Sequence, residues 1–442
     1  MKRTLAICVC ATLAVTSQAR AGFEDSLGVG PEAMALGGSF AARGGSYASV
    51  YYNPAGLSPV GEHGGFLEIT AGAVYAHPTL HVTGANGGPL FTTGIDGTTP
   101  APVADTGGVL LGARFSVGRP LKIDGLNLGL SVFIPGQLFD WNIRPDDDIQ
   151  WALLGDRTQV ISIHGGLGWR INRFLSVGVS VRVLFNTQTN NTGEVTAVTI
   201  DPKTGGVDAA AQIGSDAQVF AQAYPIVGVL ITPIERLRLG LVYRNASYVN
   251  DWGTTQINGV PDLGSIGYSD HFAHYYEPLE VTLAASFDVT PRFDVSADVT
   301  YARWSDALST NLNFWGPGRW GDTVIPAFGA RFRATSALAL MAGYRFQKSP
   351  IDNFGGPSNL LDCDRHIESL GLDLHLGKLL HAPTFDVHLT AGLQYTVLVE
   401  RTEVKNPQLF PSDALYYSNP GYPSYSYGGH MVATQATLQA RW

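Results

Sequence analysis

Side chains that could carry chemistry are few and scattered in this sequence. His271, His274 and Glu277 follow one another at intervals of three residues, and their nitrogen and oxygen atoms are of the kinds that bind metal ions. No helical pattern places the three on one face, so the sequence favours separate polar residues, and we predict no metal and no cofactor. Cys363 is the one cysteine beyond residue 10, so we expect no internal disulfide and a loop thiol without function.

Signatures of common enzyme classes are missing from the sequence. It contains no Gly-x-Ser-x-Gly nucleophile elbow, no Walker loop and no Cys-x-x-Cys pair. An enzyme without these signatures would need a Ser or Asp set beside a His, and no such set can be assembled from the sequence. The sequence therefore predicts a protein that is not an enzyme.

Arginine is the remaining residue of chemical interest, because a guanidinium can bind a carboxylate through two parallel hydrogen bonds. Several arginines alternate with apolar residues and so share one face of the predicted strands: Arg182, Arg238, Arg244, Arg331, Arg333 and Arg345. The same face also holds Asp294, Asp298, Asp373 and Asp386. One or two arginines, with Arg182 and Arg345 as candidates, could hold the acid group of a ligand. An internal ladder of ion pairs is the favoured interpretation for any single arginine.

The elements that position these residues are strands. Val177, Val179 and Val181 alternate with Gly178 and Ser180, and the same period of two recurs along the chain. In a soluble sandwich the apolar face is buried, whereas in a membrane barrel the apolar face contacts lipid. The predicted strands span 65–82, 108–118, 126–137, 158–170, 174–187, 217–232, 236–248, 278–289, 292–303, 324–334, 337–348, 366–378, 384–400 and 430–442.

Loop lengths and composition choose between these two classes. The connections alternate between short turns and long loops, and the strand number is even, as in bacterial outer-membrane barrels. Only 15% of the residues are charged, against about 25% in an ordinary soluble domain. No interior stretch is long and apolar enough for a membrane-spanning helix. We therefore predict an all-β fold, a 14-stranded antiparallel transmembrane β-barrel. The formal net charge of −9 argues against nucleic acid as a partner.

The N-terminal region divides into two parts. Residues 1–21 have the basic start, apolar centre and small-residue end of a signal peptide. Residues 22–64 are rich in Gly and Ala, do not alternate, and are too few to fold alone. A barrel of about fourteen strands leaves a water-filled lumen unless something fills it. We expect residues 22–64 to form a hatch, or plug, inside a barrel of residues 65–442, located in the outer membrane of a Gram-negative bacterium.

Several short motifs follow one another along the chain, at 34–38, 51–57, 128–136, 237–244, 298–304, 342–346, 362–365 and 369–371. In this order they resemble the FadL family of outer-membrane transporters for long-chain fatty acids and other hydrophobic compounds. The resemblance runs from about residue 28 to the C-terminus. It implies passive uptake of a fatty acid, with alkanes or aromatic hydrocarbons as alternatives. It also implies a monomer surrounded by lipid and lipopolysaccharide, inserted by the barrel-assembly machinery.

The resemblance further implies where ligand would be captured and how it would pass the hatch. Outer connections 188–216 and 249–277 would form a hydrophobic groove, and movement of the hatch would open a path from a deeper pocket. Two loops that only seal the barrel top are the alternative for the groove. The residues concerned are Trp252, Phe272, Tyr275 and Tyr276 in the groove, and Asn53, Pro54 and Ala55 in the hatch.

Pro135-Gly136 would interrupt the third strand. Proline lacks the N–H that a ladder needs, so a break here would bend the strand and leave wall hydrogen bonds unmade. The resemblance implies that such a kink opens a lateral exit from the lumen into the bilayer. A proline just beyond the strand end is the alternative. A barrel with this wall closed would be a non-transporting scaffold or secretion partner. A general diffusion porin is disfavoured, because the hatch would block its lumen.

Overall fold

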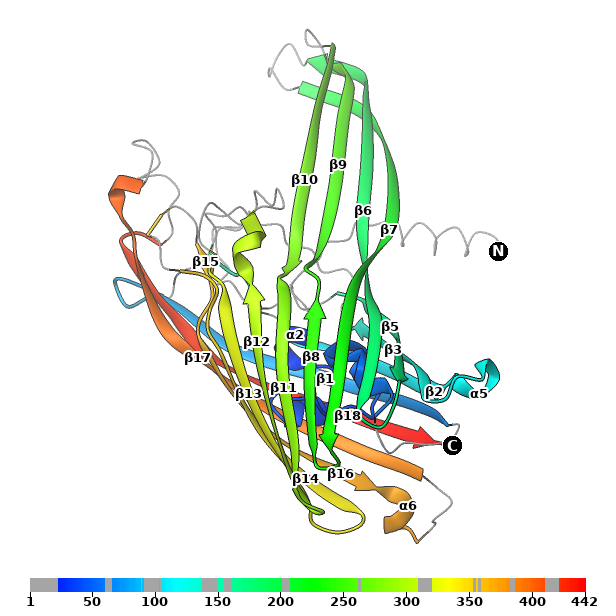
Figure 1. The fold of residues 1–442 in the computed structure, drawn as a ribbon. Helices are drawn as coiled ribbons and strands as arrows, with labels where there is room; N and C mark the ends of the chain where they lie inside the picture. The colour runs from blue at the N-terminus through cyan, green and yellow to red at the C-terminus, as the bar shows by residue number, and fades with distance from the viewer. Residues whose placement is uncertain are drawn as a thin grey trace.

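A computed structural model shows the chain as a closed barrel with an N-terminal segment inside it (Figure 1). It describes residues 23–59, 66–88, 90, 103, 105–136, 149–154, 160–200, 207–260, 264–308, 320–352, 355–356, 359–381, 386–409 and 421–442. None of the helices among these residues is both long and apolar enough to cross a membrane.

The barrel wall consists of 14 antiparallel strands, as predicted. Strand β1 pairs with β18, β6 pairs with β7, and neighbours in sequence pair in between, which closes the sheet. The wall strands are β1 (Leu67–Gly84), β2 (Thr106–Ser116), β3 (Leu126–Pro135), β5 (Ser162–Arg170), β6 (Leu175–Ile200), β7 (Val207–Ile234), β8 (Leu237–Arg244), β11 (Leu279–Thr290), β12 (Phe293–Arg303), β13 (Thr323–Arg333), β14 (Leu338–Gln347), β16 (Arg365–His375), β17 (Asp386–Val404) and β18 (Ser424–Arg441).

The alternation of residue types follows the wall as a membrane barrel requires. Leu241 of β8 and Leu283 of β11 face each other outside the barrel and are 48% and 61% exposed. Val242 and Ala284, the next residue on each strand, point inward and are buried. Large apolar residues thus cover the outside, which lipid would contact, whereas the inward positions hold polar residues together with buried apolar ones.

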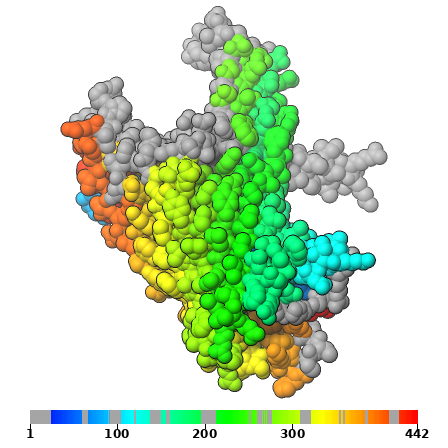
Figure 2. All heavy atoms as spheres, viewed as in Figure 1, coloured from blue at the N-terminus to red at the C-terminus, as the bar shows by residue number. Residues whose placement is uncertain are grey.

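Two outer connections differ from the prediction, because they are strands rather than loops. β6 and β7 continue far above the wall, and a hairpin of β9 (Ser247–Val260) and β10 (Gly264–Glu277) stands beside them. β9 runs parallel to the upper part of β6, pairing Thr187 with Asp251 and Glu194 with Asn258. We call this four-stranded projection the tower; it rises well above the wall in Figures 1 and 2.

The N-terminal segment, residues 23–59, consists of short helices joined by tight turns. These are α2 (Phe23–Leu27), α3 (Pro31–Ala35), α4 (Ser49–Tyr52) and the 3-10 helix η1 (Pro54–Leu57). α3 packs on β14, β16, β17 and β18, whereas α4 and η1 pack on β3, β5 and β6. The segment therefore reaches across the lumen from one wall to the other.

The remaining described elements lie at the two barrel rims. β4 (Gln150–Trp151) and β15 (Leu360–Leu361) form a small parallel sheet. The 3-10 helices η3 (Trp304–Leu308) and η5 (Pro407–Leu409) follow β12 and β17. The short helices α5 (Gly118–Leu121) and α6 (Leu376–Leu379) lie in the turns after β2 and β16.

Candidate functional site

The N-terminal segment sits directly against the wall because the wall carries glycine where the two meet. A Cβ atom added to Gly178 would lie 2.2 Å from the Pro54 carbonyl carbon, and one on Gly343 would lie 2.1 Å from that of Leu36. No side chain fits at such distances. The wall glycines that meet the segment in this way are Gly112, Gly129, Gly168, Gly178, Gly228, Gly240, Gly329, Gly343, Gly371 and Gly392.

Asn53 anchors the turn that the sequence singled out. Its buried side-chain amide donates to the carbonyl oxygens of Ala41 (2.7 Å) and Val229 (3.2 Å). Its Oδ1 accepts from the Ala55 N–H at 3.1 Å, which caps η1. Pro54 occupies the first position of η1, where its missing N–H costs nothing. Asn53, Pro54 and Ala55 thus join the N-terminal segment to the wall at β7.

Arg182 joins three parts of the molecule. From β6 its guanidinium contacts Glu24 of α2 at 2.8 Å and forms a close ion pair with Glu277 at the base of the tower. It also donates to Ser247 of β9. The arginine and both glutamates are almost completely buried. Arg182 therefore holds the N-terminal segment and the tower together.

The other predicted lumen arginines also meet acidic or carbonyl oxygens. Arg244 Nη1 lies 2.5 Å from Glu280, and its guanidinium covers the ring of Tyr51. Arg331 bridges Asp294 of the wall and Glu32 of α3. The remaining contacts are Arg238 with Asp288, Arg333 with Asp294, and Arg345 with the Ser26 carbonyl. An internal ladder of polar contacts connects wall and segment, as the favoured interpretation predicted.

A cavity of about 90 Å³ lies between the N-terminal segment and strands β8 and β11–β14. Its aromatic and apolar lining comes from Tyr51, Tyr52, Leu153, Tyr276, Trp304 and Ile325. Its charged lining comes from Glu24, Glu277, Glu280, Asp298, Arg244, Arg345 and Arg365. Carboxylates therefore outnumber guanidiniums around it. Asp298 accepts the N–H groups of Phe40 and Ala41 at 2.9 Å, so it also holds the segment.

Two of the four predicted groove residues have described side chains, and these two have different surroundings. Trp252 lies on β9 and is 38% exposed. Tyr276 is buried at the tower base, 2% exposed, beside Trp304, and lines the cavity rather than an outer groove. The side chains of Phe272 and Tyr275 lie outside the described residues. Of the predicted acid-binding arginines, Arg345 lines this cavity and Arg182 does not.

An apolar cluster fills the opposite side of the lumen. Wall residues Val74, Leu110 and Phe133 pack with Phe40 and Tyr47 of the N-terminal segment. The cluster continues through Tyr427 and Met431 of β18 and Trp151 of β4. Its position was not predicted, because only the strand register shows which inward residues become neighbours.

Pro135 is the last residue of β3, where one of its two ladders has already ended. The ladder with β5 ends at Phe133 and Ser162. On the other side the Gly136 N–H donates to the carbonyl oxygen of Gly107, in β2, at 2.7 Å. Since successive N–H groups alternate in direction, the nitrogen of Pro135 faces β5, where no hydrogen bond can form.

Three other wall prolines occupy comparable positions. Pro78, Pro225 and Pro326 each lie within two residues of the end of one ladder. Proline therefore marks ladder ends in this barrel generally. The prediction of an interrupted strand needs revision, because Pro135 ends β3 in the described residues rather than breaking its middle.

The remaining candidates are the possible metal ligands of the 249–277 connection and the cysteine. The side chains of His271 and His274 lie outside the described residues, and Glu277 is engaged by Arg182. Cys363 is buried beside Tyr427, and burial raises the pKa of its thiol to about 12, so it is not a reactive thiolate.

Comparison with known proteins decides the family. Residues 10–408 match the model of the family described as outer membrane protein transport protein (OMPP1/FadL/TodX). The chain belongs to this family. It is thus a non-enzymatic transport barrel of the Gram-negative outer membrane, and its family transports hydrophobic compounds.

Individual relatives are distant but match over almost the whole chain. Alkane uptake protein A of Marinobacter nauticus is 22% identical over 413 residues, which cover 87% of this chain and 86% of that protein. The crystal structure of a Pseudomonas aeruginosa FadL homologue is 17% identical, with a TM-score of 0.54, covering 97% of this chain and 98% of that one. The P. putida toluene transporter TodX is 14% identical, with a TM-score of 0.54, covering 94% and 98%. These structures establish the fold.

Proposed function

We propose that the protein takes up uncharged hydrocarbons through the outer membrane. In this proposal residues 22–64 are a hatch, and cargo passes from the cavity along the apolar cluster to an outlet between β3 and β5. The observation that supports an uncharged cargo is the engagement of the lumen arginines by acidic and carbonyl oxygens of wall and hatch.

The entrance side of the route would be aromatic. Tyr276 packs on Trp304, and Trp304 stacks on Trp320 at a ring separation of 5.2 Å. These rings and Leu153 cover the cavity beneath the tower. A hydrocarbon gains from contact with such rings without any polar partner. We propose that Trp252, Phe272 and Tyr275 of the tower collect cargo before it reaches this point.

The charges around the cavity argue against a carboxylate cargo. Glu280 and Asp298 line it beside Arg244, and an incoming acid would compete with carboxylates already in place. Burying an additional negative charge there would be costly without a further cation. An uncharged molecule meets no such penalty.

The apolar cluster would supply the path toward lipid. Phe133 lies next to the end of the β3–β5 ladder, so cargo that reaches it is close to Pro135 and Gly136. Transfer from water into the bilayer stabilises an alkane by about 0.8 kcal/mol per CH₂ group. No further energy source is needed for inward movement.

In this proposal the hatch shifts when cargo passes, since Phe40 and Tyr47 of the hatch belong to the apolar cluster that forms the route. Gly44 and Gly45 have φ values of 73° and 85°, a conformation that glycine adopts without strain. We propose that residues 44–57, between these glycines and the end of η1, move together when cargo passes, with Asn53, Pro54 and Ala55 as the part released from β7.

A long-chain fatty acid is the second candidate cargo. Arg345 favours it, because this arginine lines the cavity and could meet the acid group there. We further propose that the protein is a monomer in lipid and lipopolysaccharide, inserted by the barrel-assembly machinery.

Uptake by cells tests the proposal. A host without its own transporters of this family would express the chain and receive labelled hexadecane, toluene or oleate. We expect uptake of hexadecane or toluene, lost in Pro135→Val and kept in Pro326→Val, the matched control on the opposite wall. Oleate uptake that Arg345→Met abolishes would replace this proposal with the second candidate. No uptake of any compound by a correctly folded barrel would contradict transport and favour a scaffold or secretion partner.

A further inference from the structure

Two short motifs of the same form face each other at the ends of β16 and β17. They are Asp373-Leu374-His375 and Asp386-Val387-His388. Residues two apart on a strand share a face, so each motif presents its Asp and its His together. The register places His375 directly opposite His388. Two histidines and two aspartates therefore meet beside the short β16–β17 turn.

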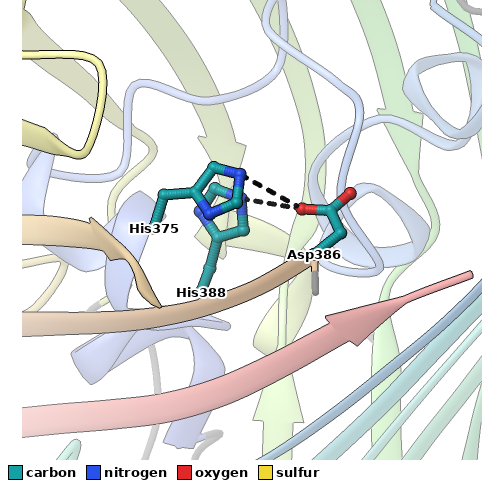
Figure 3. A group of neighbouring side chains, drawn as sticks. All are labelled: His375, Asp386 and His388. Atoms are coloured by element: carbon teal, nitrogen blue, oxygen red, sulfur yellow. Dashed lines mark ion pairs between the residues drawn. The ribbon is translucent and has the colours of Figure 1, made fainter. Parts of the chain in front are cut away.

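Three of these side chains surround one point. Asp386 Oδ1 lies 3.6 Å from His375 Nε2 and 3.4 Å from His388 Nε2, and both rings lie beside that oxygen in Figure 3. All three ligand atoms lie within 4.8 Å of one another. Ligands of a tetrahedral zinc ion, bound at about 2.0–2.1 Å, are about 3.3 Å apart. Two of the three separations are therefore already close to those of a metal site.

Asp373 orients one of the two rings. His388 Nδ1 lies 3.1 Å from both carboxylate oxygens of Asp373, and Thr390 donates to the same carboxylate at 2.9 Å. A carboxylate that accepts the Nδ1 proton leaves the Nε2 lone pair for a metal, an arrangement common behind zinc-binding histidines. His388 therefore has the second contact that a metal ligand usually has.

His375 would have to give up one hydrogen bond to bind a metal ion. Its Nδ1 accepts a long hydrogen bond, 3.4 Å, from the Lys378 N–H of α6. Binding of an ion at Nε2 would place the ring proton on Nδ1, and this weak contact would be lost. The ring already lies 4.5 Å from that of His388, centroid to centroid, so a small rotation brings the third separation into range.

We propose that His375, His388 and Asp386 bind a divalent ion of the zinc type at the periplasmic mouth of the lumen, with Asp373 as a positioning residue. Two imidazoles and one carboxylate suit zinc, cobalt and nickel better than magnesium or calcium. The side chains of His375, His388 and Asp386 are 14%, 29% and 47% exposed, which leaves a fourth position open to water. Within the described residues, no other group of His, Cys, Asp and Glu has this geometry.

Cobalt provides a direct test, because tetrahedral Co²⁺ absorbs visible light strongly. The full-length protein, purified without a histidine tag, would be titrated with Co²⁺ and then with Zn²⁺. We expect one Co²⁺ per barrel with a tetrahedral spectrum, displaced by Zn²⁺. His375→Asn and His388→Asn should abolish the spectrum, and Asp373→Asn should weaken binding by about 10–100-fold. The control is His366→Asn, on β16 but on its outer face.

The outcome is readable because each variant can be checked for a folded barrel by its heat-modifiable gel mobility. A folded wild-type barrel that binds no Co²⁺ would overturn the proposal. The same holds if Co²⁺ binding persists in both histidine variants, because the ion would then lie elsewhere. A third contrary result would be histidines that titrate with pH in the folded barrel but whose titration is unchanged when Co²⁺ or Zn²⁺ is added. The four side chains would then form only a hydrogen-bonded cluster.

Discussion

The two sides of the lumen hold the N-terminal segment, the hatch of our proposal, by different forces. Toward β6, β8 and β11–β14, charged groups such as Arg182, Arg331 and Asp298 join it to the wall. Toward the upper parts of β1–β3 and β18, apolar residues such as Leu110 and Phe133 pack against it. Ion pairs and hydrogen bonds are directional and fix geometry, whereas the hydrophobic effect is non-directional. We infer that the charged side anchors the hatch and that cargo passes on the apolar side.

Breaking the anchor should give the largest effect. Arg182→Met leaves Glu24 and Glu277 buried without their cation, and removing one partner of a buried pair costs about 3–5 kcal/mol. Hydrogen exchange of the backbone amides of residues 24–59 would measure the loss of hatch stability. Glu24→Gln, which keeps the Arg182–Glu277 pair, covers the case in which Arg182→Met does not fold.

The control for this variant is Arg238→Met. Arg238 and Asp288 form a partly exposed pair at the wall, which should contribute less than about 1 kcal/mol. Equal hydrogen-exchange protection of residues 24–59 in Arg182→Met and Arg238→Met would contradict the inference that Arg182 anchors the hatch.

A smaller effect is expected where the hatch meets a wall glycine. In Gly178→Ala the new methyl group would lie 2.2–2.3 Å from backbone atoms of Pro54 and Ala55, and such overpacking costs about 1–3 kcal/mol. The same hydrogen-exchange experiment would show faster exchange in η1. Gly165→Ala is the matched control, since a Cβ there has open space within 4 Å. Unchanged exchange in Gly178→Ala would mean that the hatch does not sit on this wall.

The smallest effect is expected at the charged side of the cavity. If cargo is uncharged, Arg345→Met should leave hexadecane uptake within about twofold of wild type, which corresponds to about 0.4 kcal/mol. Initial uptake rates in cells would measure this. A tenfold loss of hexadecane uptake would show that Arg345 contacts cargo. It would contradict the inference that cargo passes on the apolar side of the lumen.

The barrel could be predicted from sequence because alternation is local. The predicted spans 236–248 and 292–303 became Leu237–Arg244 and Phe293–Arg303, since each strand carries its own lipid-facing pattern. The tower was missed for the same reason. Residues 188–194 are polar on both faces, so no alternation marks them as strand, and their pairing with β9 depends on a distant segment.

The candidate site was predicted less well, because it depends on which inward residues become neighbours. The lumen arginines followed from strand period alone. Tyr276 was assigned to an outer groove on the composition of residues 249–277. Composition alone does not show that the last residues of this connection are buried in the barrel. The two Asp-x-His motifs were a usable signal, but only the register shows that His375 and His388 are opposite each other.

A reversible disulfide bond across the proposed outlet, called a staple below, tests lateral exit between β3 and β5 most directly. Ile134 and Ile161 come next in register after Phe133 and Ser162, so cysteines there, in a Cys363→Ser background, should bridge β3 and β5. We predict that oxidation stops hydrocarbon uptake and that reduction restores it. Cysteines at Leu241 and Leu283, which face each other on the outside of β8 and β11, form the control staple and should have no effect. Equal uptake by the oxidised and reduced β3–β5 staple would contradict lateral exit at this place.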